Sequence, residues 1–296
     1  MRPSAEEVLR RLPREALALL DRLTTVGFIS SGVVLAAQTF LALFPLLMAT
    51  TAFFPAEVSD QVAATLHTRL GLSGTTDDSV QYLVGQRSEL RGGIGVVGAI
   101  VVLASATSFT RALQRVYEQS WGLPRLGLRG SLRGLVWLAG LVVYLVLLTT
   151  AVRFAGHGPA APVTRSVITA IGTILLWWWT PFVLLLGRVR LRALSASGLL
   201  TGISVLVLGR VSTVVVPRTV RTNERRYGTI GVFFAIESWL VVIGCTIVIA
   251  AVAGAVLAQT GGPLGRWIRG AVDPDGWRRE PTRRRRAPAL PETTAD

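Results

Sequence analysis

The chain has 296 residues, of which 51% are hydrophobic and only 16% are charged, whereas soluble domains usually carry about 25% charged residues. This composition, with a mean hydropathy of +0.52, excludes an ordinary soluble enzyme. The net charge is +14, and every basic residue is Arg. Because the arginines lie between long apolar runs, the charge pattern is typical of membrane insertion and argues against nucleic-acid binding.

The apolar runs predict an all-α integral membrane bundle of six transmembrane helices. A helix rises about 1.5 Å per residue, so about 20 residues cover a hydrocarbon core of about 30 Å. Arg210 and Glu237 are the charges that interrupt the last two runs. The predicted transmembrane domain covers residues 26–258, and its spans are residues 26–54, 92–110, 134–152, 166–187, 193–216 and 229–257.

The distribution of arginine predicts the orientation of these spans. Six crossings place both termini on one side, and arginine is enriched in cytoplasmic connections. With the N-terminus inside, the inner segments carry 21 arginines and the outer segments carry 9. We therefore expect both termini in the cytoplasm. The connection 217–228 is an exception, because it would place four arginines outside, namely Arg218, Arg221, Arg225 and Arg226.

Short segments flank the spans. In residues 1–25, a capping box from Ser4 and Glu7 precedes leucines at helical spacing, which predicts an amphipathic helix on the inner surface. Apolar residues recur every four positions in residues 55–91 and predict an outer cap of two short helices. Residues 259–296 are rich in Pro and Arg, which predicts a disordered basic cytoplasmic tail that meets anionic inner-leaflet lipid.

Several residues within the spans have structural interpretations of their own. Pro45 and Pro181 are expected to kink or interrupt the first and fourth spans. The run 177–179 is three tryptophans and predicts an interfacial or lipid-facing anchor. Gly198 and Gly202 are spaced as in helix pairs that pack closely.

Arg210 and Glu237 predict the centre of the functional site. With the fifth span ending at Pro217 and the sixth starting at Thr229, both charges lie about 10 to 12 Å below the outer surface. A charge left unpaired in hydrocarbon costs about 2.5 to 3.5 kcal/mol on insertion scales. We therefore expect the guanidinium and the carboxylate to lie side by side, facing the interior of the bundle.

Two interpretations of this pair stay open. In one, the pair lines a polar path for a solute or a lipid head group; in the other, it is a buried pin that locks two helices while nearby hydroxyls bond to their own helices. The arginines of 217–228 form either a basic entrance for an anionic head group or an anchor for the hairpin. The further path residues in the first interpretation are Gln38, Thr39, Ser105, Thr107, Ser108, Ser204 and Ser238.

The residues predict no catalytic or metal-binding site, and no cofactor. The single cysteine, Cys245, lies in an apolar span and excludes a Cys-based metal cluster. His67 and His157 are scattered in outer segments, whereas metal-dependent hydrolysis of RNA needs clustered ligands. The chain also lacks a GxxxxGK[ST] loop, so we expect no ATP hydrolysis by this chain alone.

Three segments resemble the YihY/BrkB family of inner-membrane proteins, over about residues 25–260. Two departures are Glu118, where many members carry Asn, and Gly254-Ala255-Val256, where many carry Gly-Ala-Glu. Pro217-Arg218 and the small residues from Ala250 to Ala258 resemble a YhjD-like subgroup. The resembling segments are residues 36–45 with Phe44 and Pro45, residues 108–118 with Trp121-Gly122 following, and Tyr227-Gly228-Thr229-Ile230-Gly231 with Trp239 further along.

The resemblance implies a multi-pass protein of the bacterial plasma membrane with both ends cytoplasmic. Members of the family have been described as virulence factors, as ribonuclease BN and as transporters, and the residues give the ribonuclease label no support. We expect a transporter or lipid-translocating carrier for an anionic amphiphile, with membrane lipids and no nucleic acid as partners. The runner-up is a non-transporting scaffold or envelope-integrity factor. The carrier hypothesis depends on Arg210 and Glu237 facing each other.

Overall fold

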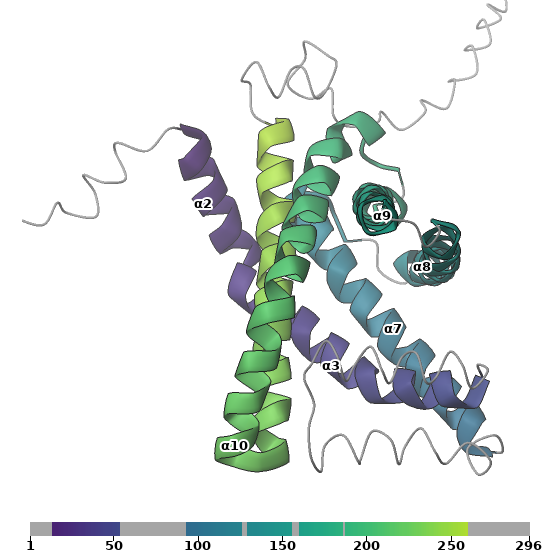
Figure 1. The fold of residues 1–296 in the computed structure, drawn as a ribbon. Coiled ribbons are helices and arrows are strands. Elements are labelled where there is room, and N and C mark those ends of the chain that lie inside the picture. The colour runs from purple at the N-terminus through teal and green to yellow at the C-terminus, as the bar shows by residue number, and fades with distance from the viewer. Residues whose placement is uncertain (1–13, 54–92, 126–128, 156–159, 186, 260–296) are drawn as a thin grey trace, which may run out of the picture.

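The structure is a computed structural model that describes residues 14–53, 93–125, 129–155, 160–185 and 187–259. These residues form helices and no strand (Figure 1). The predicted all-α fold is therefore confirmed over the described ranges. The predicted outer cap, the basic tail, His67 and His157 lie outside them. The helices are α2 (Arg14–Val26), α3 (Phe28–Phe53), α7 (Gly93–Ser120), α8 (Arg129–Phe154), α9 (Ala161–Leu184) and α10 (Leu191–Gln259).

Three of the described helices are long and apolar enough to cross a membrane, namely Arg133–Phe154, Ala161–Leu184 and Leu191–Gln259. Ala16–Val26 and Phe28–Leu43, which meet at an angle of 51°, would add a fourth if the bent pair forms one span. The bend lies at Gly27, whose φ of 60° is costly for residues with a Cβ. A membrane fold is thus supported, and the number six stays a prediction.

Helix α10 is a hairpin with two antiparallel arms (Figure 1). The backbone of Gly228, with φ 61° and ψ −148°, turns the chain between a first arm, residues 191–227, and a second arm, residues 229–259. The predicted loop over residues 217–228 is therefore wrong, because the first arm continues as a helix through Pro217. The end of the fifth membrane span at this proline stays a prediction. Val216 and Val220 are buried against Val232 of the second arm, and this packing holds the helix together beyond the proline.

Glycines set the closest approaches between helices. A Cβ on Gly254 would overlap the backbone of Ser197, whose hydroxyl donates to the Ala251 carbonyl at 3.2 Å and so joins the two arms. Gly32 of α3 lies directly against Cys245 of the second arm. Small residues let helices pack closely where no hydrophobic force draws them together, and the prediction of a close-packed bundle is confirmed at these positions.

Helices α8 and α9 form a second antiparallel pair, seen nearly end-on in Figure 1. The indole of Trp137 on α8 donates to Thr180 on α9 at 3.1 Å, and both side chains are buried. Of the three tryptophans predicted as an interfacial or lipid-facing anchor, Trp178 is 38% exposed, and its role as an anchor stays a prediction. Trp177 and Trp179 pack against the core of the bundle, because successive residues of a helix point in different directions.

Candidate functional site

The candidate site is a groove between α9 and the first arm of α10. The two helices are closest where Gly198 faces the backbone of Trp178 and Gly202 faces that of Ile174. A Cβ on Gly198 would overlap the backbone of Trp178, and a Cβ on Gly202 would meet the Cα of Ile174 in a tight contact at 3.0 Å. Arg210, twelve residues after Gly198, faces Ser166, which lies twelve residues before Trp178 on the antiparallel helix. A space of about 740 Å³ opens between the two helices towards this pair. The close contact at the glycines therefore sets one end of the groove.

Two arginines and four hydroxyl residues give the groove its chemistry, and none of the described residues that line it is acidic. Arg165, Thr169 and Thr173 follow each other at intervals of four residues, so they form one stripe along α9. The groove is also apolar in part, through Ala170 and the first arm. Its lining residues are Arg165, Ser166, Thr169, Ala170, Thr173, Val205, Leu206, Val207, Gly209, Arg210 and Thr213.

Arg210 spans the groove from the first arm. Its Nη2 donates to the Ser166 hydroxyl on α9 at 3.3 Å. A guanidinium has five N–H donors, and this is the one hydrogen bond from its side chain to the described part of the chain. Arg210 is exposed, so most of its donors are available to a ligand that carries anionic oxygens.

The predicted ion pair between Arg210 and Glu237 is wrong. No ion pair joins these two described residues, and one carboxylate oxygen of Glu237 is buried without a hydrogen-bond partner. Arg210 lies 18 residues before Gly228 and Glu237 only nine residues after it, which places them about 27 and 14 Å from the turn along their arms. The predicted equal depth assumed that residues 217–228 form a loop, but most of them are helical.

Glu237 also lies on the side of the second arm that faces α3. Phe233, one turn earlier, makes an edge-to-face ring contact with Phe40 of α3 at 6.2 Å. Gly244, two turns later, lies against the backbone of Gly32. Residues at these spacings share one helix face, so Glu237 points towards α3 and Arg210 towards α9.

The other predicted path residues do not line the groove. Gln38, Ser105, Ser108 and Ser204 are all described and partly buried, and none belongs to its lining. Their predicted role in a path stays a prediction. Thr39 and Thr107 are also predicted path residues. Their hydroxyls donate to the carbonyls of Leu35 and Leu103 on their own helices, as the alternative interpretation expects.

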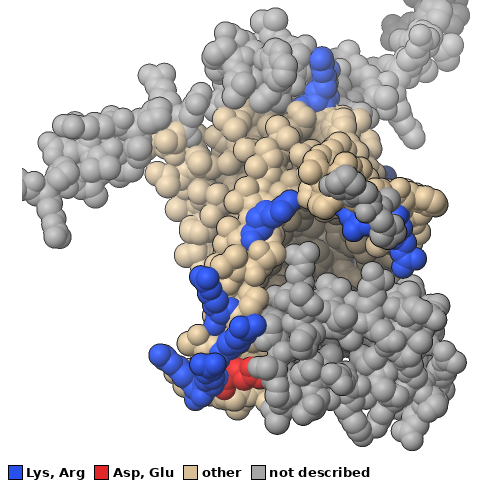
Figure 2. All heavy atoms as spheres, in the orientation of Figure 1, with Lys and Arg blue, Asp and Glu red and all other residues tan. Residues whose placement is uncertain are grey.

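The four arginines of the predicted entrance lie on the last turns of the first arm. Arg218, Arg221, Arg225 and Arg226 are all exposed. Figure 2 shows basic side chains gathered at the turn of the hairpin, beside an acidic group, and further basic side chains around a hollow on the same face. These arginines are therefore accessible, and they belong to a helix that projects beyond Arg210.

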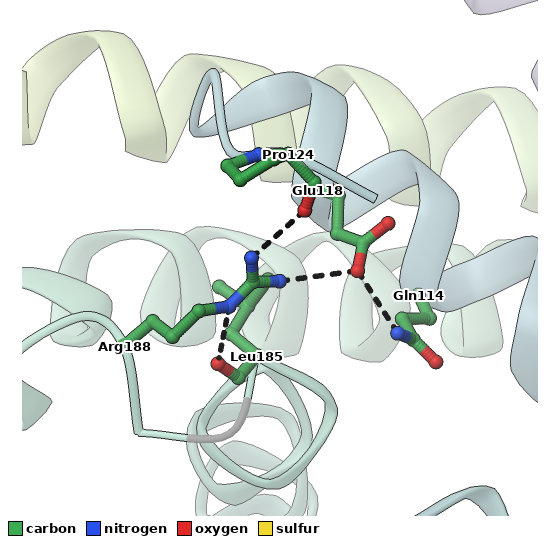
Figure 3. A network of polar contacts seen from close by, with 5 residues as sticks. All are labelled: Gln114, Glu118, Pro124, Leu185 and Arg188. Carbon is green, nitrogen blue, oxygen red and sulfur yellow. Dashed lines mark hydrogen bonds and ion pairs between the residues drawn. The ribbon is translucent and has the colours of Figure 1, made fainter. Parts of the chain in front are cut away.

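A second polar cluster was not predicted from the sequence. Arg188, in the connection between α9 and α10, pairs with Glu118 of α7 at 3.1 Å (Figure 3). Each nitrogen of its guanidinium donates a hydrogen bond, because Nη1 reaches the Pro124 carbonyl at 2.8 Å and Nε the Leu185 carbonyl at 3.1 Å. Gln114 donates to the same Glu118 oxygen at 2.9 Å. Glu118 is only 2% exposed.

This cluster fixes one end of the bundle. Around it, Tyr117, Trp121 and Val189 are fully buried. Burial raises the pKa of the Tyr117 phenol above its usual range, so this residue, which lies beyond the predicted span 92–110, stays neutral. The ion pair joins the connection between α9 and α10 to α7, and the hydrogen bond to the Pro124 carbonyl adds the connection that follows α7. These partners already satisfy the charge of Arg188. The cluster is therefore structural in its chemistry, whereas Arg210 in the groove keeps most of its donors available.

The comparison with known families supplies the identification. The family model described as Virulence factor BrkB matches residues 20–266. The chain belongs to the BrkB family. No curated protein and no solved structure matches it. The resemblance inferred from the three segments is thus confirmed, and the match makes this chain a BrkB family membrane protein.

The family motifs have definite places in this BrkB protein. Gly228 is the turn of the hairpin, and Tyr227 beside it is 64% exposed. Trp239 packs against the cluster that holds the two arms together. Glu118 is the carboxylate that pairs with Arg188. The side chains of Phe44 and Pro45 lie outside the described part, although the backbone of α3 continues through both positions.

One signal in the sequence indicates the site more fully than Arg210 alone. The spacing from Arg165 to Thr169 and Thr173 is that of a polar stripe on one helix face. Glu118 belongs to a segment that resembles the BrkB family, yet no spacing rule connects it with Arg188, which lies 70 residues away.

Proposed function

We propose that this BrkB protein is a carrier that moves an anionic amphiphile between the two faces of a membrane. The predicted Arg210–Glu237 pair no longer supports a carrier, and the proposal rests instead on the groove between α9 and the first arm. This groove brings Arg165 and Arg210 together with hydroxyl groups, and its described lining contains no acidic residue. Two guanidiniums in a cleft with partly apolar walls attract an anionic group more strongly than they would in open water.

The surroundings of the groove favour an amphiphile over a small soluble anion. Both α9 and α10 are apolar enough to cross a membrane. Val167, Ile171 and Val207, on and beside the groove walls, are 49%, 55% and 58% exposed. An acyl chain can cover such side chains while the head group stays at the arginines, since the exposed apolar surface otherwise faces only lipid.

The cellular setting belongs to the same proposal. We place the protein in a bacterial plasma membrane with six spans and with both termini in the cytoplasm, because arginine is enriched in the connections that this orientation puts inside. Its partners are membrane lipids with anionic head groups and not nucleic acids. The activity is transport without a chemical reaction on the lipid, so the protein is not an enzyme.

Reconstitution of the full-length protein tests the proposal. Vesicles of neutral phospholipid receive a trace of acyl-labelled fluorescent phosphatidylglycerol, and a membrane-impermeant quencher then measures how fast labelled lipid leaves the inner leaflet. We expect faster transfer with protein than without it, and slower transfer of labelled phosphatidylcholine. Arg210→Gln should lower the transfer of the anionic lipid about tenfold or more, as expected for the loss of a charge-assisted hydrogen bond.

Arg192→Gln is the matched control. Arg192 is an exposed arginine of the same arm that does not line the groove, so its loss should leave transfer unchanged. Equal loss in both variants would show that only net positive charge matters. Equal transfer with and without the wild-type protein would refute the carrier function.

The scaffold function is the second candidate, and the Glu118–Arg188 cluster favours it. A bundle tied together by a buried ion pair and by glycines that allow no larger residue suits a rigid membrane component. Under this alternative, Arg210→Gln would leave any cellular phenotype intact, whereas disruption of the cluster would abolish it.

A further inference from the structure

The hydroxyl groups of the groove indicate which class of anionic lipid it binds. This inference rests on the proposed carrier function. The hydroxyl of Thr169 donates to the Arg165 carbonyl at 2.8 Å, and that of Thr173 donates to the Thr169 carbonyl at 2.8 Å. Across the groove, Thr213 donates to the Arg210 carbonyl at 2.7 Å. A hydroxyl has one hydrogen, so these three oxygens have only lone pairs left for a ligand.

The groove therefore offers hydrogen-bond donors and acceptors at different places. Arg210 offers N–H groups beside Ser166, and Arg165 adds a second positive charge at the start of the stripe on α9. The acceptors, Thr169 and Thr173, follow one and two turns further along the same stripe. A ligand that satisfies the whole stripe needs anionic oxygens at one end and hydrogen-bond donors next to them.

We propose that the groove binds an anionic phosphodiester lipid whose head group carries free hydroxyl groups. The phosphodiester oxygens accept hydrogen bonds from Arg210 and lie beside the charge of Arg165. The head-group hydroxyls donate to the oxygens of Thr169 and Thr173. The acyl chains leave the groove along its apolar wall at Val205 and Val207.

Charge decides against the other common head-group donor, an ammonium. An ammonium bound at Thr169 would lie near the guanidinium of Arg210, and the described lining of the groove contains no carboxylate to offset the repulsion. A fatty-acid carboxylate fits the arginines but brings no donor for the threonines. Neutral hydroxyls on an anionic phosphodiester meet both conditions.

Two lipids of equal charge test the inference. Phosphatidylglycerol and phosphatidylmethanol are both singly charged phosphodiesters, and only the first carries head-group hydroxyls. With the same fluorescent acyl chain in the same vesicles, we expect the wild-type protein to transfer phosphatidylglycerol about fivefold faster or more, as two additional hydrogen bonds predict. The double variant Thr169→Val and Thr173→Val should reduce this ratio to about one.

Thr246→Val controls for the loss of a helical hydroxyl. Thr246 makes the same kind of bond, to the Val242 carbonyl at 2.7 Å, but it lies on the second arm and does not line the groove. This variant should keep the wild-type ratio. Because all three threonines donate only to their own helices, the valine variants are expected to fold.

The outcomes separate this inference from the carrier function. If the wild-type protein transfers both lipids equally and Arg210→Gln still abolishes transfer, the hydroxyl inference is overturned and the carrier remains. If phosphatidylserine, which carries an ammonium, moves faster than phosphatidylglycerol, the inference is likewise overturned. If the protein transfers no lipid, the carrier function fails, and competition of the two lipids for the purified protein decides the inference: equal affinities overturn it.

Discussion

Arg210 on α10 donates to the hydroxyl of Ser166 on α9 across a distance of 3.3 Å. The bond is longer than the usual 2.7 to about 3.2 Å for such donors, and its acceptor is neutral. Arg188, by contrast, donates from all three nitrogens, and one acceptor is the buried carboxylate of Glu118. The two arginines thus differ in role. The protein itself satisfies the donors of Arg188, whereas most donors of Arg210 are available to a ligand.

Arg210→Gln should therefore leave stability almost unchanged. Arg210 is exposed, and surface substitutions away from buried networks usually change the free energy of unfolding by less than about 0.5 kcal/mol. Unfolding of the detergent-solubilised protein, followed by tryptophan fluorescence in increasing denaturant, gives the measurement. A large destabilisation would show that the arginine holds α9 and α10 together, and the groove would lose its role in binding.

Arg188→Gln should destabilise the protein by about 3 kcal/mol or more, because it leaves the nearly buried carboxylate of Glu118 without its countercharge. Glu118→Gln should cost less, since the amide oxygen still accepts a hydrogen bond and no charge remains buried. The double variant should be more stable than the sum of the single effects predicts. The same denaturation experiment measures all three, and strictly additive effects would contradict the ion pair.

Exchange of the two membrane charges provides a third test. Arg210 and Glu237 lie on different faces and at different heights of the hairpin, so we expect the double variant Arg210→Glu and Glu237→Arg to show no rescue. Residues without shared contacts have additive effects within about 0.5 kcal/mol. Lipid transfer and unfolding of the two single variants and the double variant complete the cycle. Recovery of lipid transfer in the double variant would show that the two charges interact, as the sequence predicts.

The helices could be predicted because their cause is local. An apolar run of about 20 residues has few folded alternatives in a membrane, and the predicted spans 134–152 and 166–187 correspond to α8 (Arg129–Phe154) and α9 (Ala161–Leu184). The apolar run of the fifth span ends before Pro217, and the sequence therefore predicts a connection there, whereas the helix continues to the turn at Gly228. Here Val216 and Val220 pack against the second arm, and such tertiary contacts cannot be recognised from the residues beside the proline.

The site was less predictable than the fold. Arg210 was identified, since a charge within an apolar run is unusual. Its neighbour depends on the rotation of the first arm about its axis and on the position of the turn at Gly228, and neither follows from spacing alone. The approach of Arg188 to Glu118 depends on how two connections meet, so it could be known only from the structure.

Gly198→Ala tests the contact that sets one end of the groove. A Cβ at this position would meet the Cα of Trp178 at 2.5 Å and its nitrogen at 2.9 Å, and backbone atoms cannot move aside as a side chain can. We expect a loss of about 1 to 3 kcal/mol, as is usual for an overpacked contact. Gly209→Ala on the same arm is the control, because a Cβ there meets nothing within 4 Å. It should be neutral or slightly stabilising.

Gly228→Ala isolates the backbone strain of the hairpin turn from any steric contact. A Cβ at Gly228 also meets nothing within 4 Å, so it matches Gly209 in available space. The two differ in conformation, since Gly228 has a φ of 61° and a ψ of −148°, a region that residues with a Cβ adopt at a cost of about 1 to 3 kcal/mol. We therefore expect Gly228→Ala, measured by unfolding in denaturant, to be destabilised by that amount relative to Gly209→Ala. Equal stability of the two variants would contradict the strained backbone conformation at this residue.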